Sequence, residues 1–453
     1  MVHQYKNNGY NIVLDVNSGA IHLVDDLTYE IIALFESRTK EEIVSELAGR
    51  ENTKAEEIAE AYDEVAELKK EGSLFTEDSY EPYMKDFAKK RQTVVKALCL
   101  HIAHDCNLAC RYCFAEEGEY HGRRALMSFE VGKAALDFLI ANSGNRRNLE
   151  VDFFGGEPLM NFDVVKQLVA YGREQEKLHD KKFRFTLTTN GVLLNEDILE
   201  FANQEMGNLV LSIDGRKEVH DKMRPFRGGQ GSYDMILPKF KHAAESRNQT
   251  NYYVRGTYTH FNTDFSEDVL SLADQGFEQI SVEPVVAPPE EAYALTEEDL
   301  PKLFEEYDKL AAEMVKRIKA GNSFNFFHFM IDLEGGPCVA KRLSGCGSGT
   351  EYLAVTPWGD FYPCHQFVGN EEFLMGNVFE GITRPDIRDD FKACNVYSKD
   401  QCQSCFAKFY CSGGCAANSF NFTGSVNGAY EIGCELQKKR IECAIMIKAA
   451  TAE

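Results

Sequence analysis

Between residues 95 and 321 the sequence alternates six apolar runs with polar-faced helical segments. The runs are "ALCLHIA", "LEVDFF", "FRFTLTT", "NLVLSID", "YYVRGTYT" and "QISVEPVV". Six strand–helix units require parallel strands and right-handed crossovers, and they place functional residues at the carboxyl ends of the strands. The pattern therefore predicts an α/β domain. A partial barrel and a doubly wound sheet both satisfy it, because periodicity alone does not separate them.

Length and charge indicate a multidomain protein of the cytosol. A chain of 453 residues is too long for one ordinary core. Its net charge of −23 and pI near 5.0 argue against nucleic-acid and anionic-membrane partners, which need a basic face. The sequence has no signal-peptide pattern and no apolar run long enough to span a bilayer. We therefore expect a cytoplasmic protein with no nucleic acid and no membrane among its partners.

Residues 1–85 are predicted to form a small domain of their own. "YNIVLDV" and "AIHLVD" surround the turn "NSG" as a β-hairpin, three helical segments follow, and "SLF" (73–75) is a candidate further strand. This combination indicates a winged-helix-like module. A DNA-binding winged helix is the alternative, but the many glutamates on the helices make phosphate contact unfavourable. The polar residues 76–92 are interpreted as a linker.

The fourteen cysteines are clustered, whereas core thiols would be scattered. Cys106, Cys110 and Cys113 follow the first apolar run of the α/β region, ten more lie between Cys338 and Cys443, and none lies between Cys113 and Cys338. In a reducing compartment such clusters indicate metal or redox chemistry. Three thiolates without a fourth predict a [4Fe–4S] cluster with one iron open to a non-protein ligand. A zinc site completed from elsewhere and plain buried thiols are the alternatives, although C-x3-C-x2-C is not a usual zinc spacing.

The segment "CNLACRYCF" resembles the signature of the radical S-adenosylmethionine (SAM) enzymes, and "FGGEP", "TTNG" and "SIDG" stand where relatives carry them. The resemblance covers the whole α/β region. It implies that Cys106, Cys110 and Cys113 bind the cluster and are the catalytic residues, and that the amino and carboxylate groups of SAM chelate the open iron. Reductive cleavage of SAM would then give a 5′-deoxyadenosyl radical that abstracts a hydrogen atom from the substrate.

The same resemblance implies that the motif "GGEP" and one aromatic residue contact SAM. Gly155 and Gly156 would let the backbone approach the ammonium group of SAM, and Glu157 would accept a hydrogen bond from it. A plain turn is the alternative explanation of this motif. Tyr112 would lie against the adenine.

Two further SAM contacts are implied at strand ends. Asn190 and Ser212 would bind the ribose hydroxyls and the carboxylate of SAM, with loop capping as the alternative role. Arg224 and Glu283 also lie at or near strand ends. Structural salt bridges explain those two residues equally well, so they are not assigned to the site.

The second cysteine region, residues 335–453, has many glycines and little regular periodicity. It is interpreted as a loop-rich domain stabilised by something other than a large apolar core. Isolated C-x2-C pairs would indicate zinc ribbons. The full order of seven cysteines, with the run C-x2-C-x5-C-x3-C, instead resembles the SPASM domain, which carries auxiliary clusters in radical SAM enzymes that modify peptides and proteins.

The SPASM resemblance implies two auxiliary [4Fe–4S] clusters, and therefore three clusters in all. The ligands of one are expected to be Cys402, Cys405, Cys411 and Cys434. Three ligands of the other are expected to be Cys346, Cys364 and Cys415. Either Cys338 completes this second set, or its open iron binds a substrate thiolate. Cys99 lies in an apolar strand and is expected in the core, while Cys394 and Cys443 receive no role.

With these resemblances the predicted fold class is α/β. The first domain, residues 1–85, is a winged-helix-like precursor-peptide recognition element. The second, residues 95–321, is a partial (β/α)6 TIM barrel of the radical SAM type. The third, residues 335–453, is the loop-rich iron–sulfur SPASM domain.

The combination of domains resembles one class of maturase in particular. In a precursor-peptide recognition element an extended leader adds as a strand to the sheet edge. Together with "CNLACRYCF" and "CGSGTEYLAVTPWGDFYPCHQF", this module resembles the maturases of "six cysteines in forty-five" (SCIFF) precursor peptides. Such enzymes join a cysteine sulfur to a carbon of another residue as a thioether. The implied partners are a cysteine-rich precursor peptide and a flavodoxin or ferredoxin reductant.

Two alternative functions stay open. An anaerobic sulfatase maturase, which makes formylglycine, has a similar SPASM pattern. It carries Asp directly after the cysteine that matches Cys364, where this chain has His365, and it would not need a leader-binding module. A non-catalytic iron–sulfur electron carrier would explain the cysteines but not the GGEP motif or the α/β scaffold.

Overall fold

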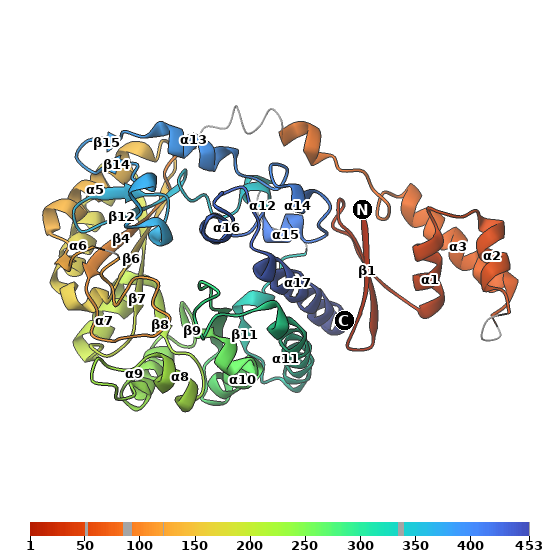
Figure 1. Cartoon of the computed structure of the whole chain (residues 1–453), viewed down its shortest axis with the longest axis horizontal. Helices are drawn as coiled ribbons and strands as arrows, with labels where there is room; N and C mark the ends of the chain where they lie inside the picture. Colours follow the sequence, from red (N-terminus) through yellow and green to blue (C-terminus); the bar gives the residue numbers. More distant parts are fainter. Residues whose placement is uncertain (50–52, 85–92, 121, 334–338, 453) are drawn as a thin grey trace.

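The computed structural model describes residues 1–49, 53–84, 93–120, 122–333 and 339–452. Figure 1 shows a curved sheet with helices on its outer side and the N-terminal module to one side of it. A long helix, α17 (Glu431–Thr451), lies between the two.

Six parallel strands form the wall of the central sheet, and they coincide with the six predicted runs. They are β4 (Ala97–His104), β6 (Asn148–Gly155), β7 (Lys182–Thr189), β8 (Met206–Ser212), β9 (Tyr252–Tyr258) and β10 (Gln279–Pro284). Each pairs with the next along the chain. A doubly wound sheet would reverse this order at a switch point. The predicted α/β class with a parallel sheet is therefore confirmed, and the strand order is that of a barrel wall.

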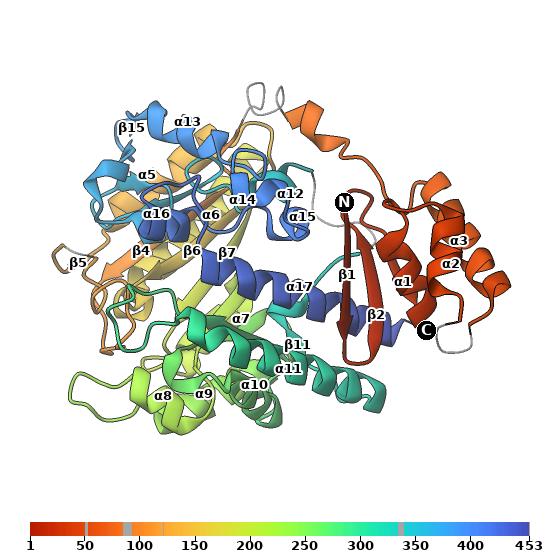
Figure 2. The same cartoon turned by 45° about the vertical axis from the view of Figure 1, so that its right-hand side comes forward.

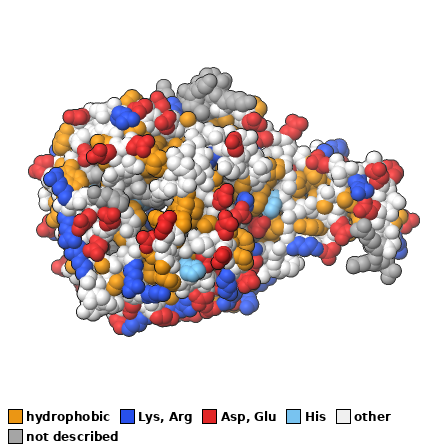
Figure 3. All heavy atoms as spheres, in the orientation of Figure 1, with side chains coloured by type: hydrophobic (Ala, Val, Ile, Leu, Met, Phe, Trp, Pro, Cys, Tyr) orange, Lys and Arg blue, Asp and Glu red, His pale blue; other side chains and the backbone are white. Residues whose placement is uncertain are grey.

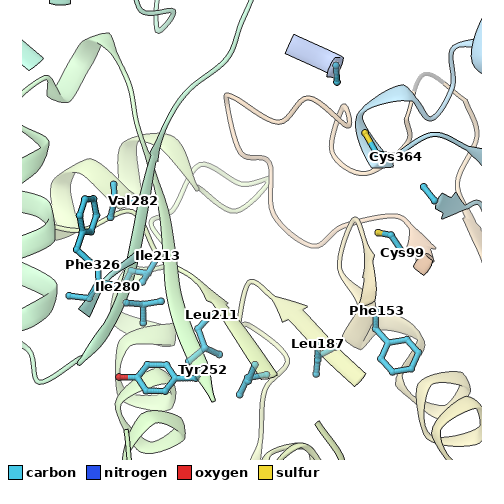
Figure 4. Packing of buried hydrophobic residues seen from close by; sticks show 14 of the residues in the cluster. Cys99, Phe153, Leu187, Leu211, Ile213, Tyr252, Ile280, Val282, Phe326 and Cys364 are labelled. Atoms are coloured by element: carbon cyan, nitrogen blue, oxygen red, sulfur yellow. The ribbon is translucent and has the colours of Figure 1, made fainter. Parts of the chain in front are cut away.

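The two faces of this wall differ in chemistry because successive side chains point to opposite sides of a strand. Residues such as Phe153, Leu187 and Leu211 are fully buried on the outer face (Figure 4). A Cβ placed on Gly172 of the outer helix α6 (Phe162–His179) would lie 2.8 Å from the Phe185 ring. The outer face is thus the apolar core between sheet and helices.

Helices after each strand cover the outer face. They are α5 (Phe129–Asn142), α6, α7 (Glu196–Glu205), α8 (Lys217–Met223), α9 (Tyr233–Ser246), α10 (Phe265–Asp274) and α11 (Leu300–Ala320). A two-residue strand, β5 (Ala125–Leu126), pairs with the end of β4. The alternation predicted between residues 95 and 321 is observed throughout.

The C-terminal region continues the same sheet. Strand β12 (Tyr352–Val355) pairs in parallel with β4, on the side opposite β6. Strands β13 (Asp360–Tyr362), β14 (Gly376–Asn377) and β15 (Gly381–Ile382) follow in antiparallel order. At the other end of the sheet, β11 (Asn325–Phe326) pairs with β10. The boundary expected at residue 335 therefore does not coincide with a break in the sheet.

Short helices make up much of the remaining C-terminal region. They are α12 (Val339–Ser344), α13 (Pro385–Ala393), α14 (Asp400–Gln403), α15 (Lys408–Cys411) and α16 (Ala416–Thr423). Helix α17, with 21 residues, is an element that the sequence reading of this region did not predict.

The N-terminal module contains three antiparallel strands followed by three helices. The strands are β1 (Val2–Asn7), β2 (Tyr10–Asp15) and β3 (Ile21–Val24), in that order across the sheet. The helices are α1 (Asp26–Leu34), α2 (Lys40–Leu47) and α3 (Ala55–Lys70). The hairpin and the three helices were predicted, whereas β1 was not. The suggested strand at 73–75 is wrong, because Leu74 is buried in the module's core and Phe75 has φ of +56°.

The module packs on α17 through its first strand (Figure 2). The Tyr5 hydroxyl donates to the main-chain oxygen of Glu442 at 3.0 Å, and His3 Nε2 lies 2.9 Å from the Glu442 carboxylate. The Asn7 amide donates to Asp308 on α11 at 2.7 Å. These contacts cover one edge of the three-stranded sheet and fix the module beside the barrel.

Part of the predicted linker is also attached to the C-terminal region. The Asp78 carboxylate accepts from Lys408 Nζ at 2.8 Å and from the Tyr397 hydroxyl at 2.8 Å. Lys408 is only 4% exposed, so this ion pair lies largely out of water. Residues 85–92 of the linker lie outside the described residues.

The exposed side chains agree with the acidic composition. On the face in Figure 3, acidic groups are spread widely with basic groups between them, and no basic stripe crosses that face. No helix in the described part of the chain is both long and apolar enough to cross a membrane.

The Asp78–Lys408 pair should contribute strongly to stability. Asp78→Asn leaves a buried ammonium without its counterion, and we expect a loss of about 2–4 kcal/mol in the free energy of unfolding. The exposed pair Lys69–Glu36 is a matched control, since Glu36→Gln should cost less than about 1 kcal/mol. Urea denaturation of both variants measures the difference, and equal losses would contradict the expectation.

Candidate functional site

The inner face of the barrel wall is polar and half-exposed. Asp152 on β6, Thr186 on β7 and Ser212 on β8 alternate with the buried core residues of their strands. Arg255 on β9 forms a two-pronged ion pair with Glu283 on β10, at 3.0 and 2.8 Å. The Arg255 side chain is 47% exposed although it belongs to a central strand, because it faces the open interior. The barrel therefore encloses a polar space suited to a ligand.

The three-cysteine loop starts one residue after β4, where the strand ends. Its backbone is bound to the segment after α8: the Ala109 amide donates to the Pro225 oxygen and the Arg111 amide to the Met223 oxygen, both at 2.9 Å. Cys106, Cys110 and Cys113 are half-buried and free. The structure thus places all three thiols at the carboxyl end of the strand, where the sequence predicted them.

The donor set of this loop suits an iron–sulfur cluster. Burial, then the charge of Glu157, and to a smaller extent the charges of Cys110 and Cys113 together raise the pKa of Cys106 to about 12. Thiols that disfavour each other's ionisation bind as thiolates when a soft metal supplies positive charge. In the described residues no three His, Cys, Asp or Glu groups converge on a single metal ion. A cubane does not require such convergence, because each thiolate binds a different iron.

The motif "GGEP" is a tight turn packed on the cysteine loop. A Cβ on Gly155 would lie 2.4 Å from the Ala103 oxygen, and one on Gly156 would lie 2.1 Å from the Asp105 oxygen. Gly155 also has φ of +121°, which side chains rarely adopt. Only glycine fits at either position, so the motif fixes the start of the loop that carries Cys106.

Glu157 is fully buried and links the carboxyl ends of β6 and β7 through hydrogen bonds. It accepts hydrogen bonds from the Thr189 hydroxyl at 2.8 Å, the Asn190 amide at 2.8 Å and the Leu159 amide at 3.0 Å. Burial raises its pKa to about 7. Its oxygens are thus engaged within the protein, and a hydrogen bond that Glu157 would accept from the ammonium group of SAM stays a prediction.

Asn190 and Ser212 both lie at the carboxyl end of the wall. The Asn190 side-chain amide donates to Asn107 Oδ1 at 2.8 Å and lies 3.6 Å from Cys106 Sγ. The Asn107 amide nitrogen is buried without a hydrogen-bond partner. The structure therefore brings Asn190 directly to the cysteine loop. Ser212 ends β8 on the inner face, and its contact with SAM stays a prediction.

Tyr112 belongs to a polar network that the sequence reading missed. Its hydroxyl donates to the Asp214 carboxylate at 2.8 and 2.7 Å, and the Arg224 guanidinium lies 5.4 Å from its ring centre. Arg224 Nε pairs with the fully buried Asp214 at 3.0 Å. The Thr257 amide also donates to Asp214. "SIDG" contains Asp214, but an aspartate after a strand looks like an ordinary cap in the sequence.

Five cysteines of the C-terminal region line one cavity, namely the four of one expected set and Cys415 of the other. A hollow of about 810 Å³ is lined by residues from the barrel mouth, α17 and the short helices. Its cysteines include Cys402, Cys405, Cys411 and Cys434. Burial, and then the charges of Cys434, Cys402 and Cys405, together raise the pKa of Cys411 to about 12. The structure thus brings together the four thiols that the sequence grouped.

The other predicted group also comes together. Burial raises the pKa of Cys364, and the charges of Cys415 and Cys346 raise it further, so the three thiols are near neighbours. Cys338 lies outside the described residues. Cys99 is 2% exposed within the core, as expected.

Imidazole rings line the wall beside these thiols. His101 and His104 of β4 are buried and share one contact of 3.0 Å between Nδ1 and Nε2. The remaining nitrogen of each ring has no hydrogen-bond partner. His365, which follows Cys364, lies between the rings of Phe154 and Phe114. The sequence reading had noted only His365 among these three.

The Radical SAM superfamily model matches residues 100–275, which contain the cysteine loop, the GGEP turn and five of the six wall strands. Residues 100–275 form a radical SAM domain. Among curated proteins, the chain is 25% identical over 363 residues to the cysteine-type anaerobic sulfatase-maturating enzyme of Clostridium novyi. That match covers 75% of this chain and 92% of the relative. The chain is thus similar in sequence to a sulfatase-maturating enzyme over most of its length.

The share of each protein that the alignment covers differs among the relatives. An uncharacterized protein of Methanocaldococcus jannaschii is 33% identical over 138 residues, and the match covers 30% of this chain and 45% of that protein. The chain thus spans less than half of that relative.

Two solved structures share the fold. The protein anSMEcpe with bound AdoMet aligns with a TM-score of 0.65 and 19% identity, covering 79% of this chain and 100% of its own. SuiB of Streptococcus suis, bound to its precursor peptide SuiA, aligns with a TM-score of 0.54 and 17% identity. It covers 96% of this chain and 98% of its own. The chain thus shares its fold with a protein that was solved with a precursor peptide bound.

Asp152 should make stability depend on pH. Burial, and then the charge of Glu150, raise its pKa from 3.8 to about 6. The folded protein therefore retains a proton that the unfolded chain releases, so this group's contribution to stability falls as pH rises from about 4 to 6. Asp152→Asn should stabilise the chain by about 1–3 kcal/mol at pH 8 and by less at pH 5. Urea denaturation at both pH values measures this change. Glu200→Gln on the outer helix α7 is the exposed control, and a gain from Asp152→Asn that did not depend on pH would contradict the assignment.

Proposed function

We propose that the chain is a radical SAM peptide maturase that installs thioether crosslinks in a cysteine-rich precursor peptide. The observation that carries the proposal is one combination of features. Three groups of cysteine thiols lie around one polar barrel, and an N-terminal module presents a free sheet edge. When bound, the reduced cluster and SAM supply a radical that takes a hydrogen atom from a substrate carbon, and auxiliary clusters supply an acceptor for the one remaining electron. A peptide thiol and a C–H group would thus lose two hydrogens in total.

The residues of the cysteine loop would bind and orient the first cluster. Cys106, Cys110 and Cys113 supply three thiolates, and the turn at Gly155 and Gly156 fixes where their loop begins. The Tyr112–Asp214–Arg224 network supports the far side of the loop through the Tyr112 hydroxyl. Asn190, Ser212 and Glu157 stay the proposed SAM contacts at the ends of neighbouring strands.

The C-terminal thiols would bind two auxiliary [4Fe–4S] clusters. Cys402, Cys405, Cys411 and Cys434 form one proposed ligand set. Cys346, Cys364 and Cys415 form the other proposed set. Its fourth ligand is proposed to be Cys338 or the thiolate of the substrate. The proximity of the thiols within each group supports this division.

The free edge of the N-terminal sheet is the proposed docking site of the leader. Of the two edge strands, β1 packs on α17, while β3 pairs only with β2 among the described residues. Leu23 on β3 is 49% exposed and offers an apolar contact. An added strand would gain main-chain hydrogen bonds along this edge. The free cysteines agree with the reducing cytoplasm in which flavodoxin or ferredoxin would act as reductant.

Sulfatase maturation is the second candidate, and the similarity to the Clostridium novyi enzyme favours it. In that reaction an Asp after the matching cysteine serves as base, whereas His365 stands here between two phenylalanine rings. This departure and the additional N-terminal module weigh toward the peptide maturase.

The two candidates predict different products. Anaerobic co-expression with a cysteine-rich peptide encoded beside the chain should give loss of two hydrogens per bridge, with equal loss of alkylatable thiol, by mass spectrometry. Cys106→Ser should abolish both 5′-deoxyadenosine and product. Cys434→Ser should retain 5′-deoxyadenosine formation and lose the crosslink. An aldehyde gained with loss of sulfur would instead establish formylglycine chemistry.

Leader binding should depend on β3. Leu23→Glu places a charge where an apolar contact is expected, and the affinity for a fluorescent leader peptide should fall on the order of tenfold. Leu178→Glu changes a 72% exposed leucine on α6 and serves as the control. Fluorescence anisotropy measures both affinities. Equal affinities for the two variants would exclude the β3 edge.

A further inference from the structure

Lys399 is a buried ammonium group without an anionic partner. Its side chain is 1% exposed and precedes α14. Nζ donates to the Ser419 hydroxyl at 3.1 Å and to the main-chain oxygen of Gly428 at 3.0 Å. In the part of the chain that the structure describes, Lys399 forms no ion pair with a carboxylate. Lys408, which is almost as buried, differs because Asp78 neutralises it.

Burying an ammonium group in this way costs folding free energy unless a negative charge lies nearby. Two neutral acceptors satisfy two of the three N–H donors of an ammonium group, but they do not compensate its charge. Removing an uncompensated charge from water costs several kcal/mol even after relaxation. A stable folded state therefore requires an anion close to Lys399 Nζ, and no carboxylate of the described residues provides it.

The groups around Lys399 are cysteines of both C-terminal sets. On the side of one set, the Ser419 hydroxyl that accepts from Nζ donates in turn to the main-chain oxygen of Cys415 at 3.0 Å. Lys399 and Cys346 line the same small hollow of about 30 Å³. The Cys402 amide donates to the Lys399 main-chain oxygen at 3.0 Å. The side chain thus lies between the two groups of thiols.

We propose that Lys399 is the fixed countercharge of both auxiliary iron–sulfur clusters and raises their reduction potentials. This inference rests on the proposed function, since it requires the two C-terminal thiol groups to bind clusters. One-electron reduction adds a negative charge to a cluster already surrounded by thiolates. A fixed cation in a medium of low dielectric constant stabilises that added charge and makes reduction easier. Lys399 is therefore a positioning residue for electron transfer, not a group that touches substrate.

Other cations near these thiols are compensated or exposed. Lys438 lies close to Cys434, but Glu435 binds it at 2.6 Å and its side chain is 34% exposed. Water and Glu435 both weaken its field at the thiols. Lys438→Gln is therefore the matched control, because it removes the same unit of charge beside the same group.

The test is a potentiometric titration of the reconstituted chain followed by electron paramagnetic resonance. Lys399→Gln and Lys399→Met should shift the midpoint potentials of the auxiliary signals to more negative values, and Lys399→Arg should restore them toward wild type. The signal of the Cys106 group should not shift. Lys438→Gln should give a smaller shift than Lys399→Gln. Two neutral variants of different shape keep the test available if one of them fails to fold.

The outcomes separate this inference from the function on which it rests. A wild-type chain without auxiliary signals, with iron for one cluster only, would overturn the proposed function. Three clusters in wild type with unchanged potentials in folded, fully loaded Lys399→Gln would overturn the role of Lys399 alone. Equal shifts in Lys399→Gln and Lys438→Gln would also overturn it, because overall charge and not the buried position would then decide the potential.

Discussion

In a pleated strand every second side chain must leave the sheet on the same face, and six neighbouring parallel strands of this chain follow that rule together. Phe153, Leu187 and Leu211 bury the outer face against helices, and this burial fixes the register of the wall. The inner face then receives Asp152, Ser212, Arg255 and their polar neighbours. Because the strands are parallel, their carboxyl ends meet at one rim. The cysteine loop, the GGEP turn and Asn190 all lie at that rim.

The C-terminal region extends this arrangement instead of standing apart from it. Strand β12 pairs with β4, the strand that leads into the cysteine loop. The proposed auxiliary ligands Cys346 and Cys364 flank β12 in the sequence. The main-chain hydrogen bonds between β12 and β4 therefore fix the cysteine loop relative to the segments that carry Cys346 and Cys364.

Much of this could be predicted from the sequence, and the failures have physical causes. The six wall strands were correct because long apolar runs alternate with helices. The division of the C-terminal cysteines into two sets came from the SPASM resemblance and stays a prediction. Helix α17 was missed because α11 on one side and β1 on another surround it, so its apolar residues form no single stripe. Strand β1 was missed because His3, Gln4 and Lys6 interrupt the apolar pattern. Asp214 and Lys399 act through distant partners, and a single sequence does not show which partners those are.

The attachment of the N-terminal module to α17 joins residues that are 439 positions apart, as the His3–Glu442 contact shows. During synthesis the first strand emerges from the ribosome long before its helical partner exists. The three-stranded sheet can therefore fold early around its own core, but it has to wait for translation of α17 before it takes its place beside the barrel. A nascent chain would thus carry an undocked module for most of its time on the ribosome.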